Sequence, residues 1–275
     1  MNASETAIPA FMSDTPNAAG LSNPLHASCV PWGFWASTGF GILAILAWLL
    51  FQWIAAAVIF VWLGINPHSS AEEVKAVASH GAMIAAATIG AMPAAVAVLA
   101  LAARLAHCRF ADYLALVRPT RSDLLLGISI LAVLLPLGDL TSWLTGRDIV
   151  PAFVVDAYRT ARASNTVVVF ILALVVAAPV MEELLFRGFL LRGYAASRLG
   201  PVGAVLLTSA AWASMHVQYE VFYVVQIFIL GCVFGWLRLR SGSTTLTLIL
   251  HGLVNLTAIT QTVYIAERRH RVESR

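Results

Sequence analysis

The sequence predicts an all-α fold, a polytopic bundle of transmembrane helices with about seven spans and a range of six to eight. Composition is the first observation: 60% of the 275 residues are hydrophobic and only 11% are charged, whereas soluble domains carry roughly 25% charged residues. The second is a series of apolar runs that approach the about 20 residues a helix needs to cross a bilayer. Backbone groups in lipid must bond within their own segment, so helices are expected rather than open strands.

Seven apolar runs follow one another, separated by short polar segments. They occupy residues 34–64, 81–105, 123–145, 166–190, 202–217, 221–237 and 244–265. The first run is long enough to tilt strongly or to form a helical hairpin, which sets the range of six to eight. Four regions are expected: a polar N-terminal tail (1–33), N-terminal transmembrane helices (34–165), a motif-bearing transmembrane core (166–265) and a basic C-terminal tail (266–275).

The charge pattern agrees with a lipid bilayer as the main partner. Arginines lie at the ends of the runs and not in one basic stripe, which is typical of helix flanks and headgroup contacts and argues against nucleic-acid binding. Placing the N-terminus inside puts most loop arginines inside. Seven spans would then put the arginine-rich C-terminus outside, so the orientation stays open.

The three cysteines carry no recognisable pattern. Cys29, Cys108 and Cys232 are scattered, odd in number and without CxxC spacing. The pattern predicts neither a disulfide framework nor a thiolate metal site. We expect no functional role for them.

Few carboxylates and imidazoles lie well inside the apolar runs, namely Asp139, Glu182, Glu183, His216 and His251. A lone charge at bilayer depth costs several kcal/mol unless it is paired or faces a cavity, so such residues are candidates for function. Asp139 follows "LLPLG" near the end of its run and is interpreted as a capping or interface residue. The other four are expected to meet in one place.

The segment "APVMEELLFRGFLL" (178–191) holds two of these carboxylates, Glu182 and Glu183, together with Arg187. Glu183 and Arg187 are four residues apart on one helix, the spacing of a side-chain pair. Glu182 points about 100° away around the helix axis and is left free to take and return a proton. Pro179 cannot donate to the helical ladder, so it loosens the backbone where the site would be built.

Two further segments supply donors and acceptors. "SAAWASMHVQYE" places Trp212 and His216 four residues apart, and "TLTLILHGLVNLT" does the same for His251 and Asn255. With Glu182 they provide a base, a proton shuttle and fixed donors, the groups needed to activate water and stabilise an oxyanion.

Simpler roles stay open for each element alone. Glu183 with Arg187 can serve as structural support alone, and Trp212 is expected only to pack. His251 and Asn255 can serve as interhelical hydrogen-bond contacts. The occurrence of all three elements in one apolar chain favours a site.

The order "EELLFR", "WASMH", "HGLVN" resembles the three signature motifs of the CAAX-protease and bacteriocin-processing family, which includes the Ras-converting CAAX endopeptidase and the bacterial Abi proteins. The family pattern is two glutamates, three residues and arginine; then Phe, three residues and His; then His, three residues and Asn. The resemblance covers about residues 166–258. Trp212 stands where the family has Phe, a difference that affects substrate fit more than proton transfer.

The resemblance implies an intramembrane endopeptidase. Glu182 would be the general base and acid working with His216, His251 and Asn255 would hold the oxyanion, and Glu183 with Arg187 would orient the site. Two glutamates and two histidines can hold Zn²⁺, but no motif has the HExxH form and the family is now treated mostly as metal-free. No cofactor is therefore expected, and a divalent metal such as zinc stays open.

The expected partners are the lipid bilayer and a membrane-associated peptide or protein substrate that reaches the buried site through a water-filled cavity. The resemblance points to the bacterial inner membrane but does not identify the substrate. Two other functions stay open: a non-catalytic membrane immunity or scaffold protein, and a proton-coupled transporter in which Glu182 and His216 form a relay. A transporter built from two repeated halves would show internal symmetry, and the sequence has none.

Overall fold

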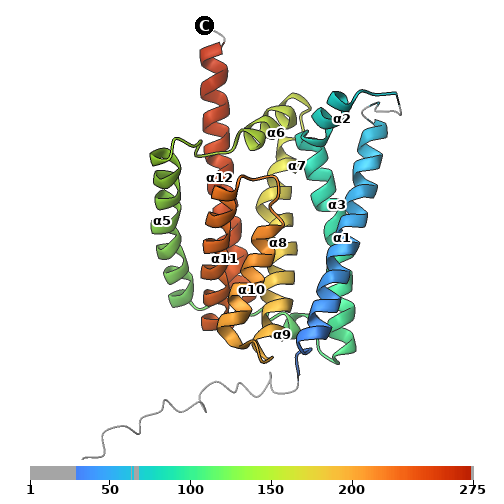
Figure 1. The fold of residues 1–275 in the computed structure, drawn as a ribbon, viewed down its shortest axis with the longest axis vertical. Coiled ribbons are helices and arrows are strands. Elements are labelled where there is room, and N and C mark those ends of the chain that lie inside the picture. The colour runs from blue at the N-terminus through green and yellow to red at the C-terminus, as the bar shows by residue number, and fades with distance from the viewer. Residues whose placement is uncertain (1–28, 63, 65–67, 274–275) are drawn as a thin grey trace, which may run out of the picture.

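The computed structural model describes residues 29–62, 64 and 68–273, and these residues form helices with no strand among them (Figure 1). The elements are α1 (Phe34–Trp62), α2 (Ala71–Ala78), α3 (Gly81–Leu105), α4 (Phe110–Tyr113), α5 (Arg121–Leu144), α6 (Ala152–Ala163), α7 (Val167–Leu172), η2 (Ala173–Ala177), α8 (Ala178–Glu183), η3 (Leu184–Leu190), α9 (Leu191–Ala195), α10 (Gly200–Ser214), α11 (Val221–Ser241) and α12 (Thr244–Glu273). Most of the predicted tail 1–33, and the last two residues of the predicted tail 266–275, lie outside the described residues.

Among the residues that the structure describes, six helices are long and apolar enough to cross a membrane, which confirms the polytopic helical bundle. They are Phe34–Trp62, Gly81–Leu105, Arg121–Leu144, Val167–Ala195, Val221–Ser241 and Thr244–Arg268. The long first run is one helix and not a hairpin. The count lies at the lower end of the predicted range.

The run 202–217 is the one that does not make a full span. It forms α10, a helix of 15 residues, which at 1.5 Å per residue is about 22 Å long, shorter than the roughly 30 Å of a bilayer core. The prediction of a seventh full span is therefore wrong. The chain nevertheless runs up along α10 and back down along α11, so α1 begins at one end of the bundle and α12 ends at the other (Figure 1).

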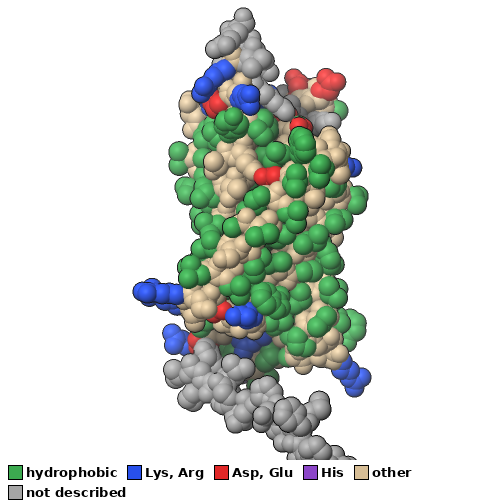
Figure 2. All heavy atoms as spheres, turned by 90° about the vertical axis from the view of Figure 1, so that its left-hand side faces the viewer, with side chains coloured by type: hydrophobic (Ala, Val, Ile, Leu, Met, Phe, Trp, Pro, Cys, Tyr) green, Lys and Arg blue, Asp and Glu red, His purple; other side chains and the backbone are tan. Residues whose placement is uncertain are grey.

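The outer surface agrees with lipid as its neighbour. Figure 2 shows the face that carries α5: hydrophobic side chains cover most of its height, and the charged side chains gather mainly towards the two ends. On α5 itself Leu125, Val133 and Trp143 are exposed. Apolar side chains exposed over this height are expected in an integral membrane protein.

The span Val167–Ala195 is the most buried of the six and is not one regular α-helix. Two π-helical stretches, η2 and η3, flank the short α8 that carries Pro179, Glu182 and Glu183. Such wide turns occur mostly as local insertions and often at functional sites. They place the two glutamates in the middle of the bundle, between α10, α11 and α12.

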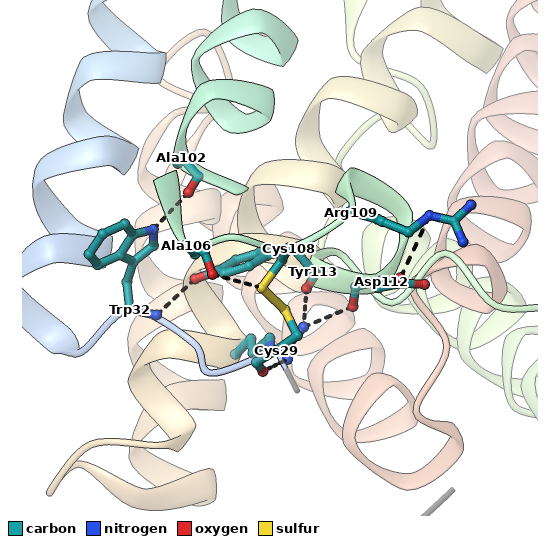
Figure 3. The surroundings of a disulfide bond; sticks show 9 residues. Cys29, Trp32, Ala102, Ala106, Cys108, Arg109, Asp112 and Tyr113 are labelled. Atoms are coloured by element: carbon teal, nitrogen blue, oxygen red, sulfur yellow. Dashed lines mark hydrogen bonds and ion pairs between the residues drawn. A yellow bond between two sulfur atoms is a disulfide. The ribbon is translucent and has the colours of Figure 1, made fainter. Parts of the chain in front are cut away.

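A disulfide joins Cys29 to Cys108, with 5.4 Å between their Cα atoms (Figure 3). The expectation that these cysteines are unpaired is therefore wrong, while Cys232 is free. The pairing depends on tertiary contacts: the Trp32 backbone N–H donates to the Tyr113 hydroxyl at 3.0 Å, and Trp32 Nε1 donates to the Ala102 carbonyl at 3.0 Å. These bonds hold the segment before α1 against the turn between α3 and α4.

Arg192, on α9, stabilises the same region. Its Nη1 donates to the carbonyls of Asp112 and Tyr113 at 2.9 and 2.5 Å, and its Nη2 donates to the Cys29 carbonyl at 2.7 Å. The guanidinium also lies over the Tyr113 ring, 4.9 Å from its centre. Three backbone carbonyls thus surround this arginine.

Candidate active site

Glu183 and Arg187 form the buried ion pair predicted from their spacing. Arg187 Nη1 lies 2.8 Å from Glu183 Oε1, and the two side chains are 1% and 0% exposed. The guanidinium lies over the ring of Trp212, 4.2 Å from its centre, and 5.5 Å from that of Phe234. A charge this deep is stable only when its partner and its hydrogen bonds are in place.

Gly231, on α11, lets the surrounding helices approach Arg187. Its carbonyl accepts a long hydrogen bond of 3.4 Å from Arg187 Nη2. A Cβ atom at this position would lie 3.0 Å from the Cβ of Ser209 and 3.1 Å from Cε3 of Trp212. A larger residue would push α11 away from α10 and move the Gly231 carbonyl away from Arg187.

His251, from α12, lies between the two glutamates. Its Nδ1 is 3.0 Å from Glu183 Oε1, and its Nε2 is 3.9 Å from Glu182 Oε2. The imidazole packs edge-on against Trp212 and tilted against Phe234. Sequence spacing joined His251 to Asn255 but gave no sign of this contact with both glutamates, because it crosses between helices.

Glu182 has a different environment from its neighbour. Its Oε2 accepts a hydrogen bond of 2.5 Å from Trp212 Nε1, and its side chain is 19% exposed where that of Glu183 is fully buried. Trp212 packs in the core as expected, at 2% exposure. The expectation that it only packs is wrong, because its indole N–H also orients the carboxylate.

His216 lies on the far side of Trp212. Its Nδ1 is 2.9 Å from the Trp212 carbonyl, and its ring stands edge-on to the indole at 5.4 Å between centres. Trp212 links the two residues: its indole N–H donates to Glu182, and its carbonyl contacts His216. With Nδ1 held by a carbonyl, Nε2 is the ring nitrogen left for a water or a substrate.

Asn255 completes the backbone bonding near Pro179. In the π-turn of η2, the N–H that would bond the Leu174 carbonyl belongs to Pro179, which has none. Asn255 Nδ2 donates to that carbonyl at 2.6 Å. Gly252 supports the contact, since a Cβ there would lie 3.2 Å from the Val175 carbonyl. Asn255 therefore joins α12 to η2 and keeps one amide N–H for other partners.

A cavity of about 870 Å³ opens beside these residues. His216, His251, Asn255 and Trp212 all line it, together with mostly apolar side chains of α5, α6, α7, α11 and α12. Glu182 borders it through its contacts with Trp212 and His251. The second and third motifs thus line this cavity, and the first motif lies behind them, in contact with Trp212 and His251.

Tyr219 lines the same cavity and was not identified from the sequence. It packs edge-on against Phe153 and beside His216. Burial and the nearby Glu182 carboxylate raise the pKa of Tyr219 to about 12, so its hydroxyl stays protonated and can donate a hydrogen bond. The signal in the sequence was an aromatic residue three positions after His216, in the short polar segment between the runs 202–217 and 221–237.

The donor atoms of this site do not fit a metal ion. Arg187 and His251 hold one oxygen of Glu183, Trp212 holds one oxygen of Glu182, and His216 turns Nδ1 to a carbonyl. Across the residues that the structure describes, no group of three or more His, Cys, Asp or Glu side chains is placed to hold one. A structural or catalytic zinc needs at least three such ligands.

Comparison with known proteins identifies the segment that carries the site. Residues 164–257 match a family model described as "Type II CAAX prenyl endopeptidase Rce1-like", nearly the segment 166–258 of the predicted resemblance. The searches of curated proteins and of solved structures gave no match. The matched residues include all three motifs, so the segment 164–257, which carries the candidate site, is similar to the Rce1-like CAAX prenyl endopeptidases.

Proposed function

We propose that this chain is an intramembrane endopeptidase that hydrolyses a peptide bond with a water molecule activated by Glu182. The contrast between two adjacent glutamates carries the proposal. Glu183 is fully buried and neutralised by Arg187, while Glu182 keeps an oxygen free beside the cavity. A carboxylate held in place but not neutralised is suited to act as a general base.

The reaction needs one proton to move twice. Glu182 takes a proton from a water molecule as the water oxygen attacks the carbonyl carbon of the peptide, and the carbonyl oxygen becomes an oxyanion. The intermediate then collapses, the C–N bond breaks, and Glu182 returns the proton to the leaving nitrogen. The products are a carboxylate and an amine.

The other residues hold the reacting groups. His251 contacts both glutamates and can stabilise Glu182 in either protonation state, and His216 presents Nε2 to the water. Donors for the oxyanion are available from the free amide N–H of Asn255 and from the Tyr219 hydroxyl, both of which line the cavity. Fixed donors of this kind are usually the largest contribution to acyl-transfer catalysis.

The substrate class follows from the cavity. Its walls are mostly apolar and lie among the membrane-spanning helices, so a membrane-associated peptide or protein fits better than a soluble one. The relationship to CAAX prenyl endopeptidases supports cleavage near a lipid-anchored or membrane-embedded end. A lateral or one-sided opening of the cavity is expected.

The test compares Glu182→Gln with the wild type in proteoliposomes that contain a library of membrane-anchored peptides, with products identified by mass spectrometry. Glu182→Gln removes the base but keeps the shape, and we expect cleavage to fall by at least 10³-fold, within the range of general acid–base catalysis and electrostatic stabilisation combined. Glu72→Gln makes the same change at an exposed position of α2 and should cleave like the wild type. Equal cleavage by Glu182→Gln and the wild type would remove Glu182 from the chemistry.

A second measurement separates hydrolysis from a covalent acyl-enzyme. Direct attack by water incorporates one oxygen from H₂¹⁸O into the new carboxylate and gives no transfer to added hydroxylamine. A hydroxamate product would instead indicate an acyl-enzyme and contradict the proposed role of Glu182. If the wild type cleaves no peptide in the library, the non-catalytic alternative gains support.

A further inference from the structure

A second polar group lines the cavity away from the two glutamates, and the proposed reaction does not use it. Asp139, on α5, accepts a hydrogen bond of 2.7 Å from Gln261 Nε2 on α12. Next to it, Gln226 Nε2 on α11 donates to the Gly138 carbonyl at 3.3 Å and to the Thr141 hydroxyl at 3.2 Å. Asp139, Gln226 and Gln261 all line the cavity, so three helices present polar groups at one place on a largely apolar wall.

The charge at this place is not balanced by the protein. Among the described residues that line the cavity, Asp139 is the one acidic residue, and none is a lysine or an arginine. Its hydrogen-bond partner is the neutral amide of Gln261. Carboxylates within membrane-spanning helices are costly, and they generally pair with a cation or mark a substrate path.

The prediction that Asp139 is a capping or interface residue is thus half right. It joins α5 to α12, but it lies inside α5, which continues to Leu144, so it caps no helix end. A contact between two helices needs only neutral partners such as the neighbouring Gln226 and Thr141. The carboxylate adds a negative charge that faces the cavity.

We propose that Asp139, held by Gln261, binds a basic side chain of the substrate peptide. This inference rests on the proposed endopeptidase function and adds a specificity site to it. A lysine or arginine that enters an apolar cavity loses water, and a carboxylate with one oxygen already oriented can replace that hydration. The aliphatic stem of such a side chain also suits the apolar wall.

The helix geometry predicts where the basic residue lies. Gln261 follows His251 by ten residues on α12, which is about 15 Å along the axis at 1.5 Å per residue. An extended peptide advances about 3.3–3.6 Å per residue. The basic residue is therefore expected four or five residues from the cleaved bond, on whichever side of it the chain runs towards Asp139.

The first experiment uses the wild-type protein in proteoliposomes. A cleaved peptide from the library is remade with a single lysine, and then a single norleucine, moved through six positions on each side of the cleavage site. We expect kcat/KM to favour lysine about tenfold at one position, four or five residues away, and not elsewhere. No preference for lysine at any position would overturn the proposal without any variant being needed.

Variants then assign the preference to Asp139. Asp139→Asn should abolish the lysine preference while it leaves cleavage of the norleucine peptide within about twofold. Asp156→Asn removes the same charge from an exposed position on α6 and should keep the preference. A preference that persists in Asp139→Asn, or disappears in Asp156→Asn, contradicts the assignment. Should Asp139→Asn fail to fold, Asp139→Glu, which keeps the charge and moves it, is expected to shift the preferred position.

Binding separates this proposal from the proposed function. In Glu182→Gln, which should not cleave, the dissociation constants of the lysine and norleucine peptides are measured by fluorescence anisotropy. Tighter binding of the lysine peptide that depends on Asp139 supports the specificity site even if no cleavage is ever seen. Equal binding of both peptides overturns it even if cleavage by the wild type is established.

Discussion

Arg187 and Arg192 lie five residues apart in the same membrane span, but the protein accommodates them in opposite ways. Arg187 has a carboxylate partner, two aromatic rings and one backbone carbonyl. Arg192 has three backbone carbonyls and the ring of Tyr113. One arginine is neutralised by a charge, and the other is solvated by peptide dipoles.

The difference separates the region of the proposed active site from one that ties the chain together. Neutralising Arg187 requires Glu183, and that pairing leaves Glu182 as the carboxylate available beside the cavity. Arg192 requires no acidic partner, so it introduces no carboxylate, and its bonds hold α9, α4 and the segment before α1. The predictions below test whether the two regions are independent in this way.

The largest expected effect is at Arg187. Arg187→Met keeps much of the side-chain volume but leaves Glu183 buried without its cation, and breaking a buried pair costs about 3–5 kcal/mol. We expect the free energy of unfolding, measured by SDS titration with tryptophan fluorescence, to fall by that amount. Arg147→Met in the exposed pair with Glu220 is the matched control, with an expected cost of about 0–1 kcal/mol.

The double variant Arg187→Met with Glu183→Gln sharpens this comparison. Removing both charges should restore much of the stability, because a buried ion pair can often be replaced by neutral groups at little cost. It should not restore activity, because His251 loses the carboxylate that orients it. Recovery of cleavage together with stability would show that Glu183 and Arg187 act only as structural support.

The disulfide is expected to have the next largest effect, on stability alone. Cys29 and Cys108 close a loop with a sequence separation of 79 residues, and a disulfide of this kind stabilises a protein by about 2–4 kcal/mol. Cys29→Ser and the double variant with Cys108→Ser should lose the same amount, measured by SDS titration as above. Per folded molecule, cleavage should be unchanged. Lost activity in correctly folded protein would contradict the independence of the two regions.

Arg192→Met should have the smallest effect of the three. The three carbonyls that Arg192 bonds lose a charged donor, which should lower the free energy of unfolding by about 1–3 kcal/mol in total. The cost stays small because these carbonyls lie near one end of the bundle and can bond water instead. The melting temperature should fall, while the Michaelis constant and kcat stay near those of the wild type. A fall in kcat of correctly folded Arg192→Met would mean that Arg192 also serves the site.

Several features could be predicted because they depend on local chemistry. Apolar runs predicted helices in lipid, and the spacing of four residues predicted the pair of Glu183 with Arg187, since both sit on one helical face. The error at α10 has a local cause as well. Its apolar run, 202–217, has fewer than the about 20 residues that a span needs, and residues 215–217 lie beyond the end of α10.

Contacts between distant segments could not be predicted, since nothing in the spacing encodes them. The disulfide joins Cys29, which precedes α1, to Cys108, which follows α3, so two spans separate them in the sequence. The odd count of three cysteines gave no sign of this pairing. Trp212 could not be recognised as a hydrogen-bond donor to Glu182, because an aromatic residue at helical spacing looks the same whether or not its N–H finds a partner. The hydrogen bond from Asn255 to the Leu174 carbonyl depends on the π-helical turn η2, which the sequence pattern did not predict.

By itself the sequence determined that the protein lies in lipid, that it is helical, and which few ionisable residues could serve a function. These features follow from hydrophobicity and helical periodicity, which act over one segment at a time. Only the tertiary structure decided which of those residues meet. It placed His251 between both glutamates, Trp212 Nε1 on Glu182, and Asp139 on the wall of the cavity that His251 also lines. Those choices depend on how four helices pack, and packing is set by close contacts such as those at Gly231 and Gly252, which act across the bundle and not along the chain.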